Sequence, residues 1–142
     1  MTQISIAPPP GFRDAQIAAY FDAAPAKDRA GLAVLRALIF DCAADLPDVG
    51  ALCETLRWGQ PSYVSARHRV GTPLRLGLTK GGGFAIYAHC QTQVIPAFAA
   101  AFPGMDRVDG SRGILFRDVG DIDPNRHGQL VRHALTYHLK PG

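Results

Sequence analysis

The sequence predicts an α+β fold, a two-layer sandwich in which helices pack on one face of an antiparallel sheet. Apolar residues recur at three- and four-residue spacing in separate blocks, which is typical of amphipathic helices. Between these blocks, runs of alternating polarity are joined by short glycine-containing segments, which indicates antiparallel hairpins. We therefore expect one sheet face to be covered by helices and the other to be partly open.

The first half of the chain predicts two helices after an N-terminal tail at residues 1–13. Asp14 can cap a short helix that Pro25 ends, because its carboxylate accepts hydrogen bonds from free N–H groups of the first turn. A longer helix follows and is closed by Pro47. Its apolar stripe consists of Leu32, Leu35, Ile39, Cys42 and Leu46. Residues 14–142 are long enough to form a single domain with its own core.

The middle of the chain predicts a strand, a turn and a hairpin. Residues 55–58 are strand-like, and Gly-Gln-Pro at 59–61 is the turn that follows them. Residues 74–79 and 84–89 alternate in polarity and are joined by Lys80 and three glycines, which favours a hairpin over a phosphate-binding loop. If the apolar residues of this hairpin face the helices, the opposite face presents Arg75, Thr79, Tyr87 and His89, near Arg57.

The last third predicts a helix, a second hairpin and a final helix. Thr92 can open the first of these helices. Residues 107–109 and 113–116 are two short strand-like runs around a turn. The final helix is expected from about Pro124 to Lys140, since proline is favoured in the first turn of a helix.

The charges are unevenly distributed, and this is more informative than the net charge of +3. Residues 55–105 contain no Asp or Glu, and their bases are Arg57, Arg67, Arg69, Arg75 and Lys80. An anion-binding surface fits this pattern, and so does a sheet edge that basic residues protect against aggregation. The sequence pI of 9.0 is only weak support for a polyanion, so nucleic acid is not favoured as a partner.

Cysteine and histidine spacing predicts no metal site, and no cofactor is expected. The three cysteines lack Cys-x-x-Cys spacing, which favours reduced thiols. His127 and His138 lie on the predicted last helix, about 16 Å apart along its axis, so they cannot share one ion. We expect His138 to be a buried, hydrogen-bonded side chain.

The N-terminal sequence favours a cytoplasmic protein without a membrane partner. The first basic residue is Arg13, after the Pro8-Pro9-Pro10 break, so the basic start and apolar run of a secretory signal are missing. No apolar stretch approaches the roughly 20 residues that cross a bilayer. The sequence does not specify an oligomeric state.

Residues 54–63 concentrate the polar groups that a binding site needs. They include Glu54, Arg57, the single Trp58, Pro61, Ser62 and Tyr63. A turn of Gly and Pro would fix the backbone and hold these side chains close together. The segment matches no catalytic signature, because Ser62 follows proline without the Gly-x-Ser-x-Gly pattern of a nucleophile elbow.

Several motifs together resemble the YdhG-like family of bacterial domains. They lie at residues 54–55, 58–63, 87–92, 98–103, 110–116 and 134–138. The similarity covers the chain from about Asp14 to His138. Members resemble frataxin in fold, an α+β sandwich, and an iron-chaperone role has been proposed for some of them. Ser111 stands where the family has Asn in a Gly-Asn-Arg pattern, whereas Arg112 matches the pattern.

The function that we expect is non-enzymatic binding of a small anionic ligand or an acidic segment of a partner protein. The predicted binding residues are Glu54, Arg57, Trp58, Pro61, Ser62, Tyr63, Arg75, Arg112 and His138. A frataxin-like iron carrier is the alternative that the resemblance implies, and the nearest approach to its acidic cluster is Asp41, Asp45 and Asp48. A further alternative is an enzyme with Glu54 as acid or base, although no paired group is visible.

Overall fold

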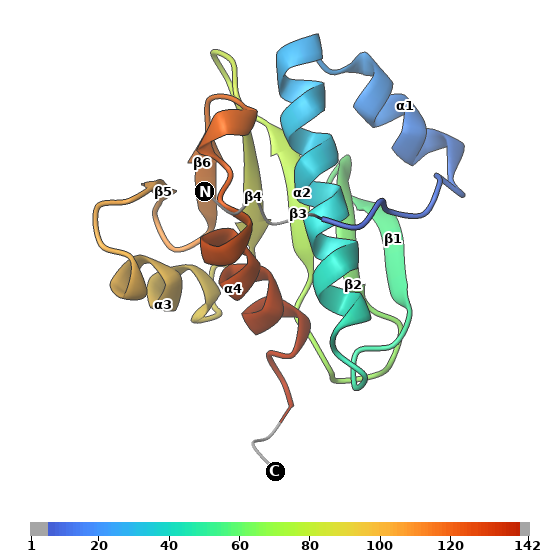
Figure 1. Cartoon of the computed structure of the whole chain (residues 1–142), viewed down its shortest axis with the longest axis vertical. Coiled ribbons are helices and arrows are strands. Elements are labelled where there is room, and N and C mark those ends of the chain that lie inside the picture. Colours follow the sequence, from blue (N-terminus) through green and yellow to red (C-terminus); the bar gives the residue numbers. More distant parts are fainter. Residues whose placement is uncertain (1–5, 140–142) are drawn as a thin grey trace.

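The computed structural model describes residues 6–139 and confirms the α+β sandwich (Figure 1). Four helices lie on one face of a six-stranded sheet, and all neighbouring strands are antiparallel. The helices are α1 (Ala15–Ala23), α2 (Ala26–Ala44), α3 (Val94–Ala101) and α4 (Pro124–Leu135). The strands are β1 (Leu52–Arg57), β2 (Gln60–Ser65), β3 (Leu74–Leu78), β4 (Phe84–Ala88), β5 (Arg107–Asp109) and β6 (Gly113–Phe116), in the spatial order β1-β2-β3-β4-β6-β5.

The first two helices form where the sequence predicts them. The Asp14 carboxylate accepts a hydrogen bond from the backbone N–H of Gln16 at the start of α1. The predicted stripe of α2 is buried at Leu32, Leu35, Ile39 and Cys42, whereas Leu46 lies beyond the helix end and is half-buried. Gly31 lets α2 approach the sheet closely, because a side chain there would overlap the ring of Phe84.

The β1–β2 hairpin differs from the prediction for residues 55–61. Trp58 and Gly59 form its two-residue turn, and Gln60 and Pro61 belong to β2. Both turn residues have positive φ, 55° and 72°, as a type I′ turn requires. Pairing of β2 with β3 begins only at Ser62, since Pro61 has no N–H to donate to the ladder.

The final helix is shorter than predicted. α4 ends at Leu135, and Lys140 lies outside the described residues. The carbonyl oxygen of Ala134 accepts a hydrogen bond from the backbone N–H of Thr72, and that of Val70 accepts one from the N–H of His138. The loop before β3 therefore binds the end of α4 and draws the following residues out of the helix.

A buried ion pair joins α2 to the sheet. The guanidinium of Arg36 donates from Nε and Nη2 to the two carboxylate oxygens of Glu54, at 2.6 and 3.1 Å, and Tyr63 Oη donates to the same carboxylate at 2.6 Å. The Arg36 side chain is only 4% exposed and that of Glu54 12%. Such pairs lose most of their hydration, so their stability depends on complete pairing. We call these three residues the Arg36 junction.

Residues 6–13, which we call the arm, lie against α2, and residues 1–5 of the expected N-terminal tail lie outside the described residues. The carbonyl oxygen of Pro10 accepts a hydrogen bond from Arg36 Nη1 at 2.8 Å, and the ring of Phe12 lies 4.2 Å from the guanidinium carbon. Further along, the N–H of Ala7 donates to Asp41 at 3.4 Å. The Arg36 junction thus holds the arm as well as the sheet.

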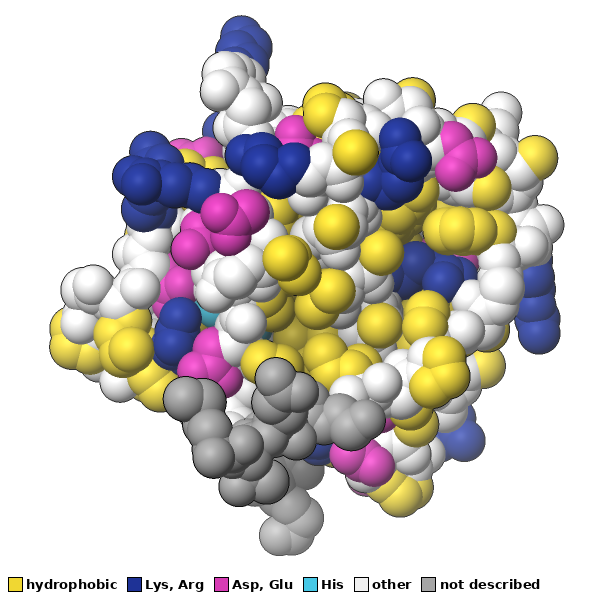
Figure 2. All heavy atoms as spheres, turned by 45° about the horizontal axis from the view of Figure 1, so that its top comes forward, with side chains coloured by type: hydrophobic (Ala, Val, Ile, Leu, Met, Phe, Trp, Pro, Cys, Tyr) yellow, Lys and Arg dark blue, Asp and Glu magenta, His cyan; other side chains and the backbone are white. Residues whose placement is uncertain are grey.

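The surface on the helix side is largely apolar in its middle. Figure 2 shows hydrophobic side chains gathered there, with basic and acidic side chains mostly around the margin. Within residues 6–139, no helix combines the length and the hydropathy that a membrane span needs.

Glu54→Gln should destabilise the fold strongly, because it leaves the buried Arg36 guanidinium without a countercharge. We expect a loss of about 3–5 kcal/mol in the free energy of unfolding, measured by urea denaturation. The matched control is Asp45→Asn, which breaks the exposed Asp45–Arg132 pair at 3.0 Å and should cost about 0–1 kcal/mol. Equal effects of the two variants would contradict a structural role for the Arg36 junction.

Candidate functional site

The structure divides the predicted binding residues between the two sides of the sheet. Successive residues of a strand point to opposite faces, and the β1–β2 register pairs Glu54 with Tyr63 and Thr55 with Ser62. Glu54, Pro61 and Tyr63 consequently lie on the side of the helices. The opposite side, which we call the open face, carries Arg57, Ser62 and Arg75.

Glu54 and Tyr63 are engaged inside the protein. Tyr63 is fully buried and donates its hydroxyl hydrogen bond to the Glu54 carboxylate, which also accepts two hydrogen bonds from Arg36. Burial, together with the bond to Glu54, raises the pKa of Tyr63, so its hydroxyl stays protonated and acts as a donor. Because both oxygens of Glu54 accept hydrogen bonds, no specific geometry supports an acid or base role for this residue.

A single row of residues crosses the open face from strand to strand. The register aligns Ser62, Arg75, Tyr87, Gly113 and Asp109 on β2, β3, β4, β6 and β5. The expected positions of Arg75 and Tyr87 opposite the helices are therefore confirmed. The row places basic and aromatic side chains on adjacent strands, where they are in contact range.

Tyr87 lies at the centre of this row, between two guanidinium groups. Its ring centroid is 5.4 Å from the guanidinium carbon of Arg75 and 5.9 Å from that of Arg112. The ring packs over Gly113, where a Cβ atom would come within 2.6 Å of it. Burial is the main cause of the raised pKa of Tyr87, so the phenol is neutral at physiological pH.

Gln60 extends the same surface toward the edge of the sheet. Its side chain lies over Gly77, where any side chain would overlap the amide. The amide oxygen of Gln60 accepts a hydrogen bond from Arg75 Nη1 at 2.6 Å. This bond orients Arg75 without neutralising its charge.

The open face has more positive charge than its own acids balance. Among residues 6–139, it carries Arg57, Arg75, Arg107 and Arg112 and one carboxylate, that of Asp109. Asp109 accepts a hydrogen bond from Arg112 at 2.9 Å, whereas the other three arginines take part in no ion pair among residues 6–139. The charges that the sequence concentrates between residues 55 and 105 thus include two of the unpaired arginines on this face.

Ser62 adds an unusual polar atom to the open face. The residue is 1% exposed, and its buried hydroxyl oxygen has no hydrogen-bond partner within the described part of the chain. Buried hydroxyl groups are normally paired, and leaving one unpaired costs about 1–3 kcal/mol. Ser62 lies between Thr55 and Arg75 in the strand register.

Trp58 lies at the tip of the β1–β2 hairpin and is 88% exposed. The prediction that a turn holds the side chains of residues 54–63 close together is wrong, because Ser62 and Tyr63 are buried on opposite sides of the sheet. An indole with this exposure does not belong to the core either. The left-handed φ of 55° at Trp58 disfavours an aromatic residue. Asparagine or glycine usually occupies a turn position with this backbone conformation.

The structure also corrects the prediction for His138, which is exposed rather than buried. The buried histidine is His127, at 1% exposure. Its Nδ1 accepts a hydrogen bond from the N–H of Asp123, so its Nε2 carries the proton and donates to Asp106 at 2.9 Å. Arg126 donates to both oxygens of Asp106, at 2.8 and 3.3 Å. Asp106 is 20 and 21 residues away from Arg126 and His127 in the sequence, and no motif signals their contact.

Asp41, Asp45 and Asp48 do not converge on a shared position. Asp45 forms an ion pair with Arg132, and Asp41 accepts a hydrogen bond from the N–H of Ala7 in the arm. No group of three or more His, Cys, Asp or Glu side chains suited to a metal ion is found among residues 6–139.

Comparison with known proteins gives no relative for this chain. No family model matches it, and no curated protein or solved structure gives a significant match. The candidate site therefore rests on geometry and charge alone.

Acid should destabilise the protein through His127. Burial lowers its pKa from the ordinary 6.5, although the bond to Asp106 acts in the opposite direction. Below pH 6.5 the unfolded chain binds a proton that folded His127 refuses, so stability decreases from that pH down to the lowered pKa of the folded state. The slope contributed by this group is at most about 1.4 kcal/mol per pH unit.

His127→Gln should flatten the pH dependence of urea unfolding below pH 6.5, even if the variant is less stable overall. The control His133→Gln removes an exposed histidine from the same helix and should leave the slope unchanged. An unaltered slope in His127→Gln would show that another group controls the acid sensitivity.

Proposed function

We propose that this chain is a non-enzymatic binding domain whose open face holds an acidic segment of a partner protein. The observation that carries the proposal is the set of arginines on this face without ion pairs. On the helix side, Arg36 and Arg126 are each paired with a carboxylate. Cations left unpaired beside an aromatic ring are well suited to carboxylates supplied by another molecule.

The extent of the basic surface favours a protein segment. Arg57 on β1 and Arg107 on β5 lie at opposite edges of the six-stranded sheet. At about 4.8 Å per strand, these edges are about 24 Å apart. A small molecule cannot contact both arginines, whereas roughly seven extended residues span this distance.

Trp58 supports the proposal as a candidate anchor beside Arg57. Tryptophan and arginine are the residues most enriched at energetically dominant positions of protein interfaces. An indole that is 88% exposed contributes little to folding, so its apolar surface is available to a partner.

A small anion is the second candidate ligand. Arg75 and Arg112 flank Tyr87, with guanidinium carbons 5.4 and 5.9 Å from its ring centroid. A carboxylate or phosphate group bound beside the Tyr87 ring could accept hydrogen bonds from either guanidinium. This position would use the middle of the open face and leave the edges free.

The YdhG-like relationship is likewise a proposal, and it rests on the sequence motifs. No specific observation favours the iron carrier that the resemblance implies or an enzyme that uses Glu54. The open face is the surface that best accounts for the arrangement of charge.

Replacing Arg57 and Arg75 together with Gln should weaken binding of a glutamate-rich twelve-residue peptide at least tenfold. Removing two exposed charge contacts of about 1 kcal/mol each is sufficient for this loss. Fluorescence anisotropy at low ionic strength measures the effect, and thermal unfolding should be almost unchanged. The control Arg13→Gln/Arg132→Gln removes the same charge from the arm and α4.

Inorganic phosphate separates the two ligand classes in the same assay. The small-anion site over Tyr87 is supported if phosphate at low millimolar concentration displaces the peptide, and if Arg112→Gln abolishes both peptide binding and phosphate binding. Equal peptide binding by the wild type and the Arg57→Gln/Arg75→Gln variant would contradict the proposed function.

Trp58→Asn should stabilise the fold and weaken partner binding. Asparagine tolerates the left-handed conformation of a type I′ turn, so we expect a gain of about 1 kcal/mol in the free energy of unfolding. Peptide affinity should fall, and in the wild type the peptide should protect the single tryptophan from iodide quenching. Unchanged affinity and quenching would place the contact away from the hairpin tip.

A further inference from the structure

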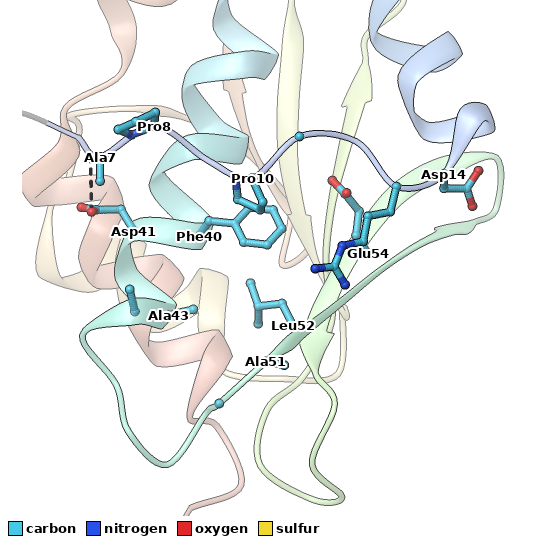
Figure 3. A pocket seen from close by; sticks show the side chains of 14 residues that line it. Ala7, Pro8, Pro10, Asp14, Phe40, Asp41, Ala43, Ala51, Leu52 and Glu54 are labelled. Carbon is cyan, nitrogen blue, oxygen red and sulfur yellow. Dashed lines mark hydrogen bonds between the residues drawn. The ribbon is translucent and has the colours of Figure 1, made fainter.

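A cavity of about 480 Å³ lies on the helix side, between the arm, the end of α2 and β1. Figure 3 shows that the arm passes over it, with Pro8 and Pro10 on one wall and Phe40, Ala43 and Leu52 on the other. The volume falls in the range of sites that hold small organic molecules. This cavity is separate from the open face, since Leu52 and Glu54 project to the other side of the sheet.

The walls of this cavity suit an apolar ligand body. Most lining groups are proline, alanine, leucine and phenylalanine side chains, and the ring of Phe40 lies beneath Pro10 (Figure 3). Burying an apolar group against such walls contributes about 25 cal/mol per Å² of surface removed from water.

The charged groups at the cavity leave one carboxylate without a countercharge among residues 6–139. Four lining residues are charged, and they are Arg13, Asp14, Asp41 and Glu54. Glu54 is neutralised by Arg36, and the formal charges of Arg13 and Asp14, which are both exposed, sum to zero. Asp41 is half-buried, and within residues 6–139 its carboxylate has only the 3.4 Å hydrogen bond from the N–H of Ala7.

Two parts of the backbone around the cavity supply acceptors without donors. Pro8, Pro9 and Pro10 have no N–H groups, so this part of the arm presents only carbonyl oxygens. Ala43 and Ala44 are the last two residues of α2 and line the cavity, and a helix C-terminus carries partial negative charge. Charge and backbone therefore both favour a cationic donor.

We infer that this cavity binds a small primary amine with an apolar body, and that Asp41 holds its ammonium group. The apolar body would lie against Phe40 and Leu52 under the arm. An ammonium group donates up to three hydrogen bonds, which suits a carboxylate and the neighbouring carbonyl oxygens.

Binding would compete with one of the two hydrogen bonds that hold the arm among the described residues. The N–H of Ala7 is a neutral donor at 3.4 Å from Asp41, whereas an ammonium forms a shorter and stronger charge-assisted bond. Pro10 stays bound to Arg36 at 2.8 Å. The ligand therefore replaces the outer contact of the arm and leaves the inner one intact.

The test compares 2-phenylethylamine, 2-phenylethanol and 3-phenylpropionate, which share a ring but differ in charge. Their binding to the full chain is followed by NMR of alanine methyl groups. We expect the amine to shift the signals of Ala43, Ala44 and Ala51 in a saturable manner, with an affinity at least tenfold above those of the alcohol and the carboxylate. The inference is overturned if none of the three compounds shows saturable binding.

Two matched pairs of variants locate the site. Asp41→Asn keeps an acceptor for Ala7 but removes the charge, so it should weaken amine binding at least tenfold. Asp48→Asn removes a charge that does not line the cavity and should have no effect. Ala44→Phe fills the cavity and should abolish binding, whereas Ala33→Phe adds the same ring at an exposed, non-lining position of α2.

The inference is wrong if the carboxylate compound binds as tightly as the amine, or if Asp41→Asn retains full affinity for 2-phenylethylamine. It is also wrong if Ala44→Phe and Ala33→Phe bind the amine equally. The Asp41 and Asp48 variants are nearly isosteric with the wild type, so a folding defect of Ala44→Phe would not prevent a decision.

Discussion

The buried guanidinium of Arg36 is the constraint on which the arrangement of the helix side depends. A guanidinium does not lose its proton at any physiological pH, so every structure that buries it must supply acceptors. Here Glu54 and the carbonyl oxygen of Pro10 do so, and Phe12 and Phe40 lie against its faces. One side chain therefore fixes the relative positions of α2, β1 and the arm. The wall of the cavity under the arm is a direct consequence.

The two sides of the sheet use charge differently. On the helix side, the buried charges of Arg36 and Asp106 are each satisfied by partners from other elements, which makes them part of the fold. On the open face, Arg57 and Arg75 contact no carboxylate among residues 6–139. Exposed charges contribute little to stability, so their arrangement there can serve recognition without affecting the fold.

Local sequence patterns predicted much of the fold, but they did not predict which residues share the candidate site. The hairpin around Lys80 was predictable because three glycines supply the turn, and α2 because its apolar stripe has helical period. Trp58-Gly59 is not a usual hairpin dipeptide, whereas the following Gln-Pro resembles a turn. Placing the turn there made residues 54–63 look like one cluster. The observed register splits them, since neighbours in a strand face opposite sides.

Contacts between distant segments were beyond local patterns altogether. Asp106 and His127 meet only because α4 packs beside the loop that precedes β5, and neither position has a sequence signal for the other. The same holds for Arg36 and Glu54, which α2 and β1 bring together. Pairings of this kind depend on packing and are specified by the whole core.

Trp58 combines an unfavourable backbone conformation with an exposed side chain. Its left-handed backbone costs the isolated protein about 1 kcal/mol, and its exposed indole recovers none of this. Burying roughly 200 Å² of aromatic surface in a complex would contribute up to about 5 kcal/mol before ordering costs. The strain is therefore small compared with what a partner could supply. A residue that disfavours its own turn is most readily understood as part of a surface completed by another molecule.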